Sequence, residues 1–273
     1  MLLYRNIQQM KKIFLPLFLA LSFCISAQTT KNLSKILELK IAGEGGANGG
    51  SVVYHPVQKK YYAALAGNTS FPMGVYDVKG KLLSPVEHQT MFDLRGLWYN
   101  PKTKNIQANG FKESGWAEYT LNTKGIPTSV KILQAGMNQP DSQNIAAFDP
   151  VGNAVFFLNY GTVDKYDYAD GKFIESITLY PGKTKDEDED LEDEFEEVYN
   201  ITTVIYTGTA GAELGLLNDI LKQVELYSIK TGYLTRVLKL PEDAPTNYWM
   251  NFAYSNGIYW LFDKTTRTWI GYK

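Results

Sequence analysis

Residues 51–81 read SVVYHPVQKKYYAALAGNTSFPMGVYDVKGK and contain three short runs of strand-forming residues separated by turn residues. The first run is small and apolar, ends in the aromatic Tyr54 and is followed at once by His55-Pro56. The third run, around Tyr76, alternates apolar and polar residues, which is typical of a strand with one buried face. It ends at Gly80, which accepts the positive φ of a tight turn. The stretch therefore predicts a unit of short strands joined by tight turns.

The same unit recurs five times along the chain. The aromatic residues that end the first strand of each unit are Tyr54, Tyr99, Phe148, Tyr206 and Tyr254, spaced 45, 49, 58 and 48 residues apart. The tyrosines of the third strands are Tyr76, Tyr119, Tyr166, Tyr227 and Tyr272, spaced 43, 47, 61 and 45 residues apart. A repeat of about 45 residues that holds several short strands indicates a propeller blade. We interpret both sets as packing residues between blades, because regular spacing in every unit suits a core.

These repeats predict an all-β chain that folds as a single five-bladed β-propeller over residues 28–273. A fourth strand follows the third, as in residues 173–179 and 234–240. The fifth unit lacks this strand, and residues 37–41 (LELKI) precede the first unit without a unit of their own. We expect this N-terminal strand to complete the last blade, since closing the ring removes two exposed sheet edges. The predicted blades are residues 51–90, 96–142, 145–185, 202–247, and 251–273 with 36–42.

The end of the first unit carries a recognisable motif. Residues 76–81 read Tyr-Asp-Val-Lys-Gly-Lys, and Asn-Pro or Asp-Pro turns follow the first strands of the second and third units. This pattern resembles the NHL and YVTN type of repeat in the β-propeller superfamily, in its exported bacterial form, and it covers nearly all of residues 28–273. The resemblance implies an architecture and no particular activity, because such propellers include enzymes, ligand binders and protein-docking platforms.

Residues 1–27 are predicted to be a secretory signal peptide. Lys11 and Lys12 supply its positive region, residues 13–25 (IFLPLFLALSFCI) its apolar region, and Ser26-Ala27 a small-residue cleavage site. The apolar run is too short for a membrane-spanning helix, although an uncleaved N-terminal anchor is the alternative. We therefore expect an exported protein, periplasmic or secreted, with no transmembrane segment after cleavage. The one cysteine, Cys24, lies in the signal, so the mature chain has neither a disulfide nor a thiolate metal site.

The charge of the mature chain is concentrated in one segment. After residue 27 there are 24 basic and 29 acidic residues, a balance that gives no electrostatic footprint for nucleic acid. Ten of the acidic residues fall within residues 186–197, between the third and fourth units. Four positions there match a calcium-binding loop: Asp186, Asp188, Asp190 and Glu197. Because Leu191 replaces the glycine that such a loop needs, we expect a solvated loop with no specific metal site, and no cofactor.

The connections that lead into the inner strands meet around the channel at one face of such a propeller. Each connection brings an amide or a carboxylate toward the axis, and Trp249 adds an aromatic wall. A concave mouth with a few polar groups and an aromatic side chain suits a small ligand or a glycan. The ligand-binding residues that we predict are Asp93, Arg95, Asn144, Asn200 and Trp249. The alternative is that these polar groups only cap the ends of strands.

We expect a non-catalytic, monomeric propeller that binds a glycan, a peptide or an envelope protein at the channel mouth. One alternative is a glycan-cleaving hydrolase, which the likeness to five-bladed glycosidases implies, with Glu44, Asp93 and Asp141 as its carboxylates. Another is a structural module of an envelope complex that uses the acidic segment as its contact. The sequence contains no nucleophile elbow, no phosphate loop and no histidine pair at metal spacing.

Overall fold

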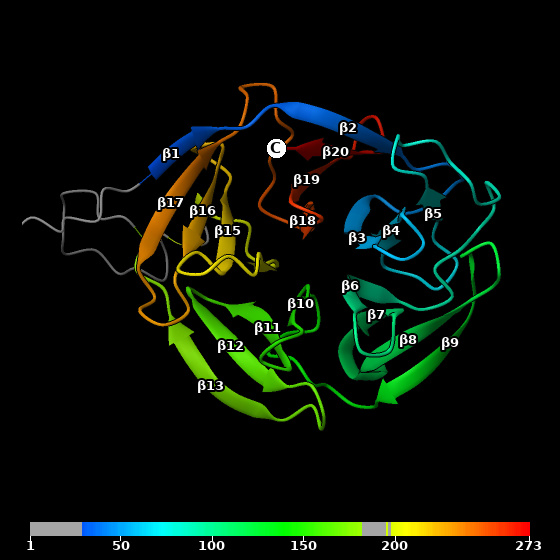
Figure 1. The fold of residues 1–273 in the computed structure, drawn as a ribbon, viewed down its shortest axis with the longest axis horizontal. Helices are drawn as coiled ribbons and strands as arrows, with labels where there is room; N and C mark the ends of the chain where they lie inside the picture. Colours follow the sequence, from blue (N-terminus) through cyan, green and yellow to red (C-terminus); the bar gives the residue numbers. More distant parts are fainter. Residues whose placement is uncertain (1–28, 182–194, 196–197) are drawn as a thin grey trace, which may run out of the picture.

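The computed structural model describes residues 29–181, 195 and 198–273. Strands in these ranges form five sheets that stand around a central axis as blades (Figure 1). One short 3-10 helix, η1 (Lys112–Ser114), lies between two strands of the second sheet. The protein is therefore an all-β, five-bladed β-propeller, which confirms the predicted fold. The predicted signal peptide and the acidic candidates Asp186, Asp188, Asp190 and Glu197 lie outside the described residues.

Each blade is a meander of antiparallel strands. Blade 1 comprises β3 (Asn48–His55), β4 (Lys60–Ala66) and β5 (Met73–Tyr76). Blade 2 comprises β6 (Leu94–Asn100), β7 (Asn105–Gly110), β8 (Trp116–Leu121) and β9 (Pro127–Gln134). Blade 3 comprises β10 (Ala147–Asp149), β11 (Ala154–Asn159), β12 (Thr162–Asp167) and β13 (Phe173–Thr178). The first strand of every blade is the innermost and contacts the first strands of its neighbours around the axis.

The last two blades are completed by the N-terminal segment of the chain. Blade 4 comprises β14 (Ile205–Tyr206), β15 (Leu214–Asn218), β16 (Gln223–Tyr227) and β17 (Leu234–Lys239). Blade 5 comprises β18 (Phe252–Ser255), β19 (Ile258–Asp263), β20 (Thr268–Tyr272) and the N-terminal β2 (Lys35–Lys40). β2 pairs antiparallel with β20, so the expected closure of the ring by this strand is what the structure shows.

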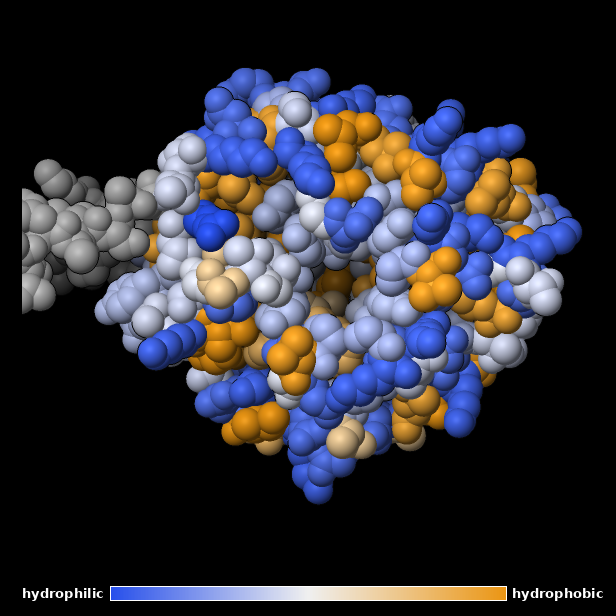
Figure 2. Space-filling view, viewed as in Figure 1, coloured by the Kyte–Doolittle hydropathy of each residue, from blue (hydrophilic) through white to orange (hydrophobic). Residues whose placement is uncertain are grey.

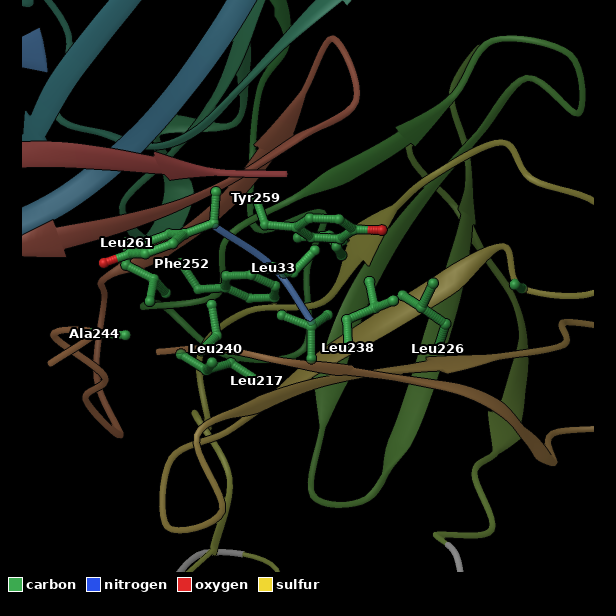
Figure 3. Close-up of a cluster of buried hydrophobic side chains, with 13 residues drawn as sticks. Leu33, Leu217, Leu226, Leu238, Leu240, Ala244, Phe252, Tyr259 and Leu261 are labelled. Carbon is green, nitrogen blue, oxygen red and sulfur yellow. The ribbon is translucent and has the colours of Figure 1, made fainter. Parts of the chain in front are cut away.

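The sequence did not predict β1 (Thr29–Asn32), which pairs in parallel with β17 and adds an outer strand to blade 4. Between β1 and β2 the backbone N–H of Leu33 donates to the Lys239 carbonyl at 2.8 Å, and that of Ser34 donates to the Lys273 carbonyl at 3.1 Å. The Leu33 side chain enters an apolar cluster that also contains Leu238 and Phe252 (Figure 3). The N-terminal segment therefore pairs with the outer strand of blade 4 and with β20 of blade 5, and so links the two blades.

Blade 1 has three strands where the repeat predicts four. Beyond β5 the chain makes only isolated bridges, one between Tyr76 and Leu82 and one between Pro72 and Gln89. The backbone groups of Val75 are satisfied by other means: its N–H donates to Ser84 Oγ at 3.1 Å, and its carbonyl accepts from Leu83 N at 2.7 Å. A regular partner strand is therefore not required along this edge.

Four of the five third-strand tyrosines are buried in the core, and the fifth, Tyr166, is partly buried against it. Tyr76, Tyr119 and Tyr227 are at most 1% exposed. The Tyr76 hydroxyl donates to the Lys40 carbonyl at 2.7 Å, and the Tyr119 hydroxyl donates to the Thr90 carbonyl at 2.8 Å. These two buried phenols therefore have hydrogen-bond partners, as buried polar groups require.

Candidate functional site

A cavity of about 290 Å³ lies on the propeller axis, at the end of the channel where the inner strands finish. All five blades line it, and each contributes the aromatic side chain at the end of its inner strand: Tyr54, Tyr99, Phe148, Tyr206 and Tyr254; Trp98 of blade 2 lines it as well. We call this end of the channel the aromatic end. The surface view down the axis shows a central hollow with an apolar floor (Figure 2). The first aromatic set therefore faces a cavity in addition to packing between blades.

The aromatic rings around the cavity are held in place by other rings. Three of them pack against a ring of the preceding blade, with the centroid pairs Tyr99–His55 at 4.8 Å, Phe148–Trp98 at 5.9 Å and Tyr206–Phe156 at 5.8 Å. The other two pack against a ring of their own blade, with the pairs Tyr54–Tyr61 at 4.8 Å and Tyr254–Tyr259 at 5.0 Å. Packing of this kind fixes the side-chain rotamers, so the cavity wall is formed before any ligand arrives.

The cavity wall is neutral but not entirely apolar. Its side chains are aromatic, aliphatic, hydroxyl or amide groups, and four of its six aromatic residues carry a phenolic hydroxyl. Burial raises the pKa of Tyr206, and the neighbouring Asp149 carboxylate raises it further. Burial also raises the pKa of Tyr254. These hydroxyls therefore keep their protons at neutral pH and can both donate and accept hydrogen bonds.

The floor of the cavity is an apolar cluster that crosses the axis. Ile145, Ala66 and Met250 come from blades 3, 1 and 5, are at most 2% exposed and pack together, with Trp249 against them. Ile145 belongs both to this cluster and to the cavity wall. The opposite end of the channel, where the connections enter the inner strands, is called the connector end below. The cavity is therefore separated from the connector end by packed side chains.

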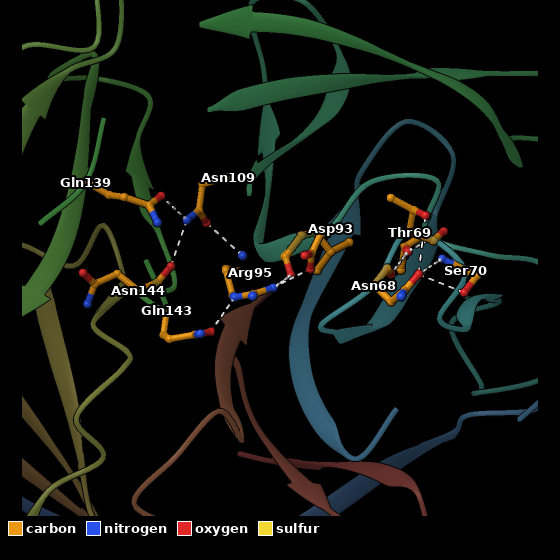
Figure 4. A network of polar contacts seen from close by, with 12 residues as sticks. Asn68, Thr69, Ser70, Asp93, Arg95, Asn109, Gln139, Gln143 and Asn144 are labelled. Atoms are coloured by element: carbon orange, nitrogen blue, oxygen red, sulfur yellow. Dashed lines mark hydrogen bonds and ion pairs between the residues drawn. The ribbon is translucent and has the colours of Figure 1, made fainter. Parts of the chain in front are cut away.

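The predicted site residues lie at the connector end, outside the wall of the axial cavity. Arg95 is 3% exposed; its Nη1 donates to Asp93 Oδ1 at 2.7 Å and its Nε donates to Gln143 Oε1 at 2.8 Å (Figure 4). The guanidinium also lies 4.5 Å from the centroid of the Phe111 ring, a cation–π geometry. Asp93 and Arg95 therefore form an ion pair within blade 2, and the bond from Arg95 to Gln143 links this pair to the connection that enters blade 3.

The amides of Asn144 and Asn200 are occupied by the chain itself. Asn144 is 4% exposed, and its Nδ2 donates to the Leu158 carbonyl at 2.7 Å while its Oδ1 accepts from Asp141 N at 2.7 Å. Asn200 is fully buried, and its Nδ2 donates to Asn251 Oδ1 at 3.1 Å. These bonds secure the connections that enter the inner strands. They match the capping role that the sequence left open as an alternative.

The three carboxylates of the hydrolase alternative lie in three different loops. Asp141 Oδ1 accepts from Gln143 N at 2.8 Å, which links it through Gln143 to Arg95 and Asp93. It also lines a second cavity, of about 550 Å³, beside Phe111. Glu44 is exposed in a separate loop whose flanking glycine carbonyls accept hydrogen bonds from Arg267. The structure therefore links Asp93 with Asp141, and it places Glu44 against another part of the chain.

Two further expectations concern metals and membranes. Among residues 29–181, 195 and 198–273, no group of three or more His, Cys, Asp or Glu side chains is placed to hold a metal ion. Across the same residues, no helix has the length and the apolar character needed to cross a bilayer.

We expect the stability of the protein to depend on pH through His55, whose ring packs against the cavity residue Tyr99. Its side chain is 2% exposed, and its Nδ1 accepts from Gln58 N at 3.3 Å. Burial lowers the pKa of His55, and it lowers that of His88 as well. An unfolded histidine takes up its proton near pH ~6.5, whereas these folded histidines stay neutral to lower pH. Their contribution to stability is therefore complete above about pH 6.5 and is lost as the pH falls toward the lowered folded pKa.

We expect the free energy of unfolding to decrease between about pH 7.5 and pH 5.5, and to decrease less steeply in His55→Phe. Phenylalanine keeps the aromatic contact with Tyr99 but cannot bind a proton, so the slope that remains belongs to His88 and the carboxylates. Urea unfolding of both proteins at several pH values measures the two slopes. Equal slopes would show that His55 does not contribute to the pH dependence.

The fold and the axial cavity together define a five-bladed β-propeller with an aromatic-lined central cavity. No family model matches the sequence, and no curated protein matches it. Among solved structures, glutaminyl cyclase of Myxococcus xanthus superposes with a TM-score of 0.56 at 8% identity, covering 90% of this chain and 97% of that one. A chain of the nidogen/laminin complex gives a TM-score of 0.42 at 12% identity and covers 69% of this chain and 62% of that one. At 8% identity, the likeness to the cyclase shows the fold alone.

Proposed function

We propose that this chain is an exported, non-catalytic propeller that binds a ligand in its axial cavity, with a glycan, a peptide or a protein partner as the candidate classes. One observation carries the proposal: every blade contributes an aromatic side chain to the wall of one cavity of about 290 Å³. Concave sites with aromatic walls and a few polar groups are the usual form of small-ligand sites. Because each of the five blades contributes an aromatic ring to this cavity, the cavity on the axis has the aromatic wall that is typical of such sites.

The composition of the wall favours binding over catalysis. General acid–base chemistry needs a group whose pKa lies near the working pH. The titratable groups of the wall are tyrosines, and burial raises the pKa of Tyr206 and Tyr254 further from neutrality. The hydrolase alternative would instead require two free carboxyl groups across a shared cleft, whereas Asp93 is paired with Arg95 and the Glu44 loop lies against Arg267.

The connector end is a second candidate surface. The Asp93 side chain is 26% exposed and forms an ion pair with Arg95. Arg95 also contacts Phe111, which lines the second cavity together with Asp141. We propose Asp93, Arg95 and Trp249 as the residues of this surface that contact a partner. A partner whose affinity is unchanged in the Asp93→Ala, Arg95→Ala, Trp249→Ala triple variant would be bound elsewhere.

We expect ligands of the axial cavity to be lost in the Tyr54→Ala, Tyr206→Ala double variant, because the substitutions remove two of the six aromatic surfaces. The measurement is saturation-transfer difference NMR of the mature protein against a mixture of neutral saccharides, short peptides and aromatic alcohols. Tyr233→Ala is the matched control, since Tyr233 is 60% exposed and lies outside the cavity wall. Ligands that bind the double variant as well as the wild type, or a mixture that yields no ligand, would contradict the proposal.

A further inference from the structure

We infer that the axial cavity binds the terminal ring of a neutral sugar, an inference that rests on the proposed function and specifies its ligand. Three properties of the cavity lead to this class: it is closed at one end, its wall is neutral, and four of the aromatic residues that line it carry hydroxyls.

The closed end determines which part of a ligand can enter. The cluster of Ile145, Ala66 and Met250 fills the channel below the cavity, so the way in is through the aromatic end. A chain cannot thread through the channel, and its interior units cannot reach the wall. The volume of about 290 Å³ lies at the lower limit of ordinary ligand sites, which suits one or two rings. The cavity therefore selects an end group, and the remainder of a longer molecule stays outside.

The neutral wall determines the charge of that group. An ionised ligand that leaves water needs a charged or strongly hydrogen-bonding partner, and without one its burial is unfavourable by several kcal/mol. Asp149, a carboxylate beside the wall residue Tyr206, is already engaged: its Oδ1 accepts from Val151 N at 2.9 Å, and it raises the pKa of Tyr206. The cavity therefore favours a sugar without a carboxylate, phosphate or ammonium group.

The hydroxyls distinguish a sugar from a purely apolar ligand. Away from the cavity, the hydroxyls of Tyr119 and Tyr227 hydrogen-bond within the chain. Within the described residues no chain partner is found for the hydroxyls of Tyr54, Tyr99 and Tyr254, which line the cavity. An apolar ligand would cover these groups and leave them without partners, which is unfavourable. A pyranose ring packs its C–H faces on aromatic surfaces and offers hydroxyls to the phenols, so it satisfies both kinds of surface.

The test compares three classes of probe on the mature protein by saturation-transfer difference NMR and calorimetric titration. The neutral class is the methyl glycosides of glucose, galactose, mannose and N-acetylglucosamine; the charged class is glucuronic acid and glucosamine; the apolar probe is indole. We expect at least one neutral glycoside to bind, and the charged sugars to bind at least tenfold more weakly. The Tyr54→Phe, Tyr99→Phe, Tyr254→Phe triple variant keeps the aromatic rings but loses the hydroxyls, so it should bind that glycoside at least tenfold more weakly than the wild type. Tyr233→Phe should bind it as the wild type does.

A second measurement uses only the wild-type protein, so its result does not depend on whether the triple variant folds. The per-O-methylated form of the glycoside keeps the ring but cannot donate hydrogen bonds, and we expect it not to bind the wild type. The inference is overturned if charged sugars bind as tightly as neutral ones, or if indole binds and no neutral glycoside does; the proposed binding function would survive either result. If tyrosine-to-alanine changes in the wall affect the binding of no probe, the proposed function itself fails.

Discussion

Replacing Glu225 with leucine is expected to lower the free energy of unfolding by at least about 4 kcal/mol. The Glu225 carboxylate is 3% exposed, and four neutral donors satisfy it. Oε2 accepts from the hydroxyls of Tyr199 at 2.8 Å and Tyr227 at 2.6 Å, and Oε1 accepts from Asn218 Nδ2 at 3.1 Å and Gln223 Nε2 at 2.6 Å. Leucine would leave four buried donors without an acceptor, and each such group costs about 1–3 kcal/mol.

Glu225→Gln separates the loss of hydrogen bonds from the loss of volume. The glutamine keeps one carbonyl oxygen as an acceptor, but its amide nitrogen faces other donors. We therefore expect Glu225→Gln to lower the free energy of unfolding by less than Glu225→Leu does. Glu175→Gln is the matched control, because Glu175 is exposed and its ion pair with Lys165, at 2.9 Å, contributes about 1 kcal/mol or less. Urea unfolding followed by intrinsic fluorescence measures all three variants. If Glu225→Leu were within about 1 kcal/mol of the wild type, the network would not stabilise blade 4 as argued.

The architecture was predictable because it repeats. Spacing between aromatics, alternation in the third strands and a glycine after them all recur in phase, and five imperfect copies support one interpretation better than any single segment does. The closing strand was predictable for a related reason: residues 37–41 had no unit of their own and the fifth unit lacked a strand. β1 (Thr29–Asn32) could not be found in this way, because all four of its residues are exposed and no apolar pattern marks it.

The location of the cavity was harder to predict from the sequence than the fold. Tyr54, Tyr99, Phe148, Tyr206 and Tyr254 carry the same periodic signal whether they pack between blades or face the channel, since both positions repeat once per blade. In the structure they do both, because one side of each ring packs on a neighbouring ring while the residue also lines the cavity. The hydroxyls on four of the five gave no distinguishing signal, because the third-strand residues are tyrosines in all five units and were interpreted as core residues.

The sequence was also ambiguous for the amides at the connector end, which were predicted to contact a ligand but are bonded within the chain. Asn144 and Asn200 were selected because polar groups converge near the axis, but strand ends also converge there, and their backbone groups need partners. Both side chains meet that need within the chain. Sequence alone cannot separate an amide that caps a strand from one that contacts a ligand, because both uses place the same residue type in the same connection.

Replacing Leu39 with alanine is expected to lower the free energy of unfolding by about 2–5 kcal/mol, the range for truncating a buried leucine to alanine. Leu39 is fully buried in β2, pairs in register with Trp269 of β20 and belongs to the apolar cluster between blades 5 and 1. It is the position at which the closing strand buries most, so the cavity left by alanine weakens the joint between the two ends of the propeller. The measurement is urea unfolding of the mature protein at pH ~7.

Ile36→Ala is the matched control, because Ile36 lies in the same strand but is 48% exposed, and we expect its effect to stay within about 0.5 kcal/mol. A large loss in Leu39→Ala with little change in Ile36→Ala would show that β2 stabilises the fold through its inward face and not merely through backbone pairing with β20. Equal and small losses would mean that the ring is held by the packing of the five inner strands alone. In that case β1 and β2 would cover the edges of blades 4 and 5 without contributing measurably to the stability of the cavity that those blades help to form.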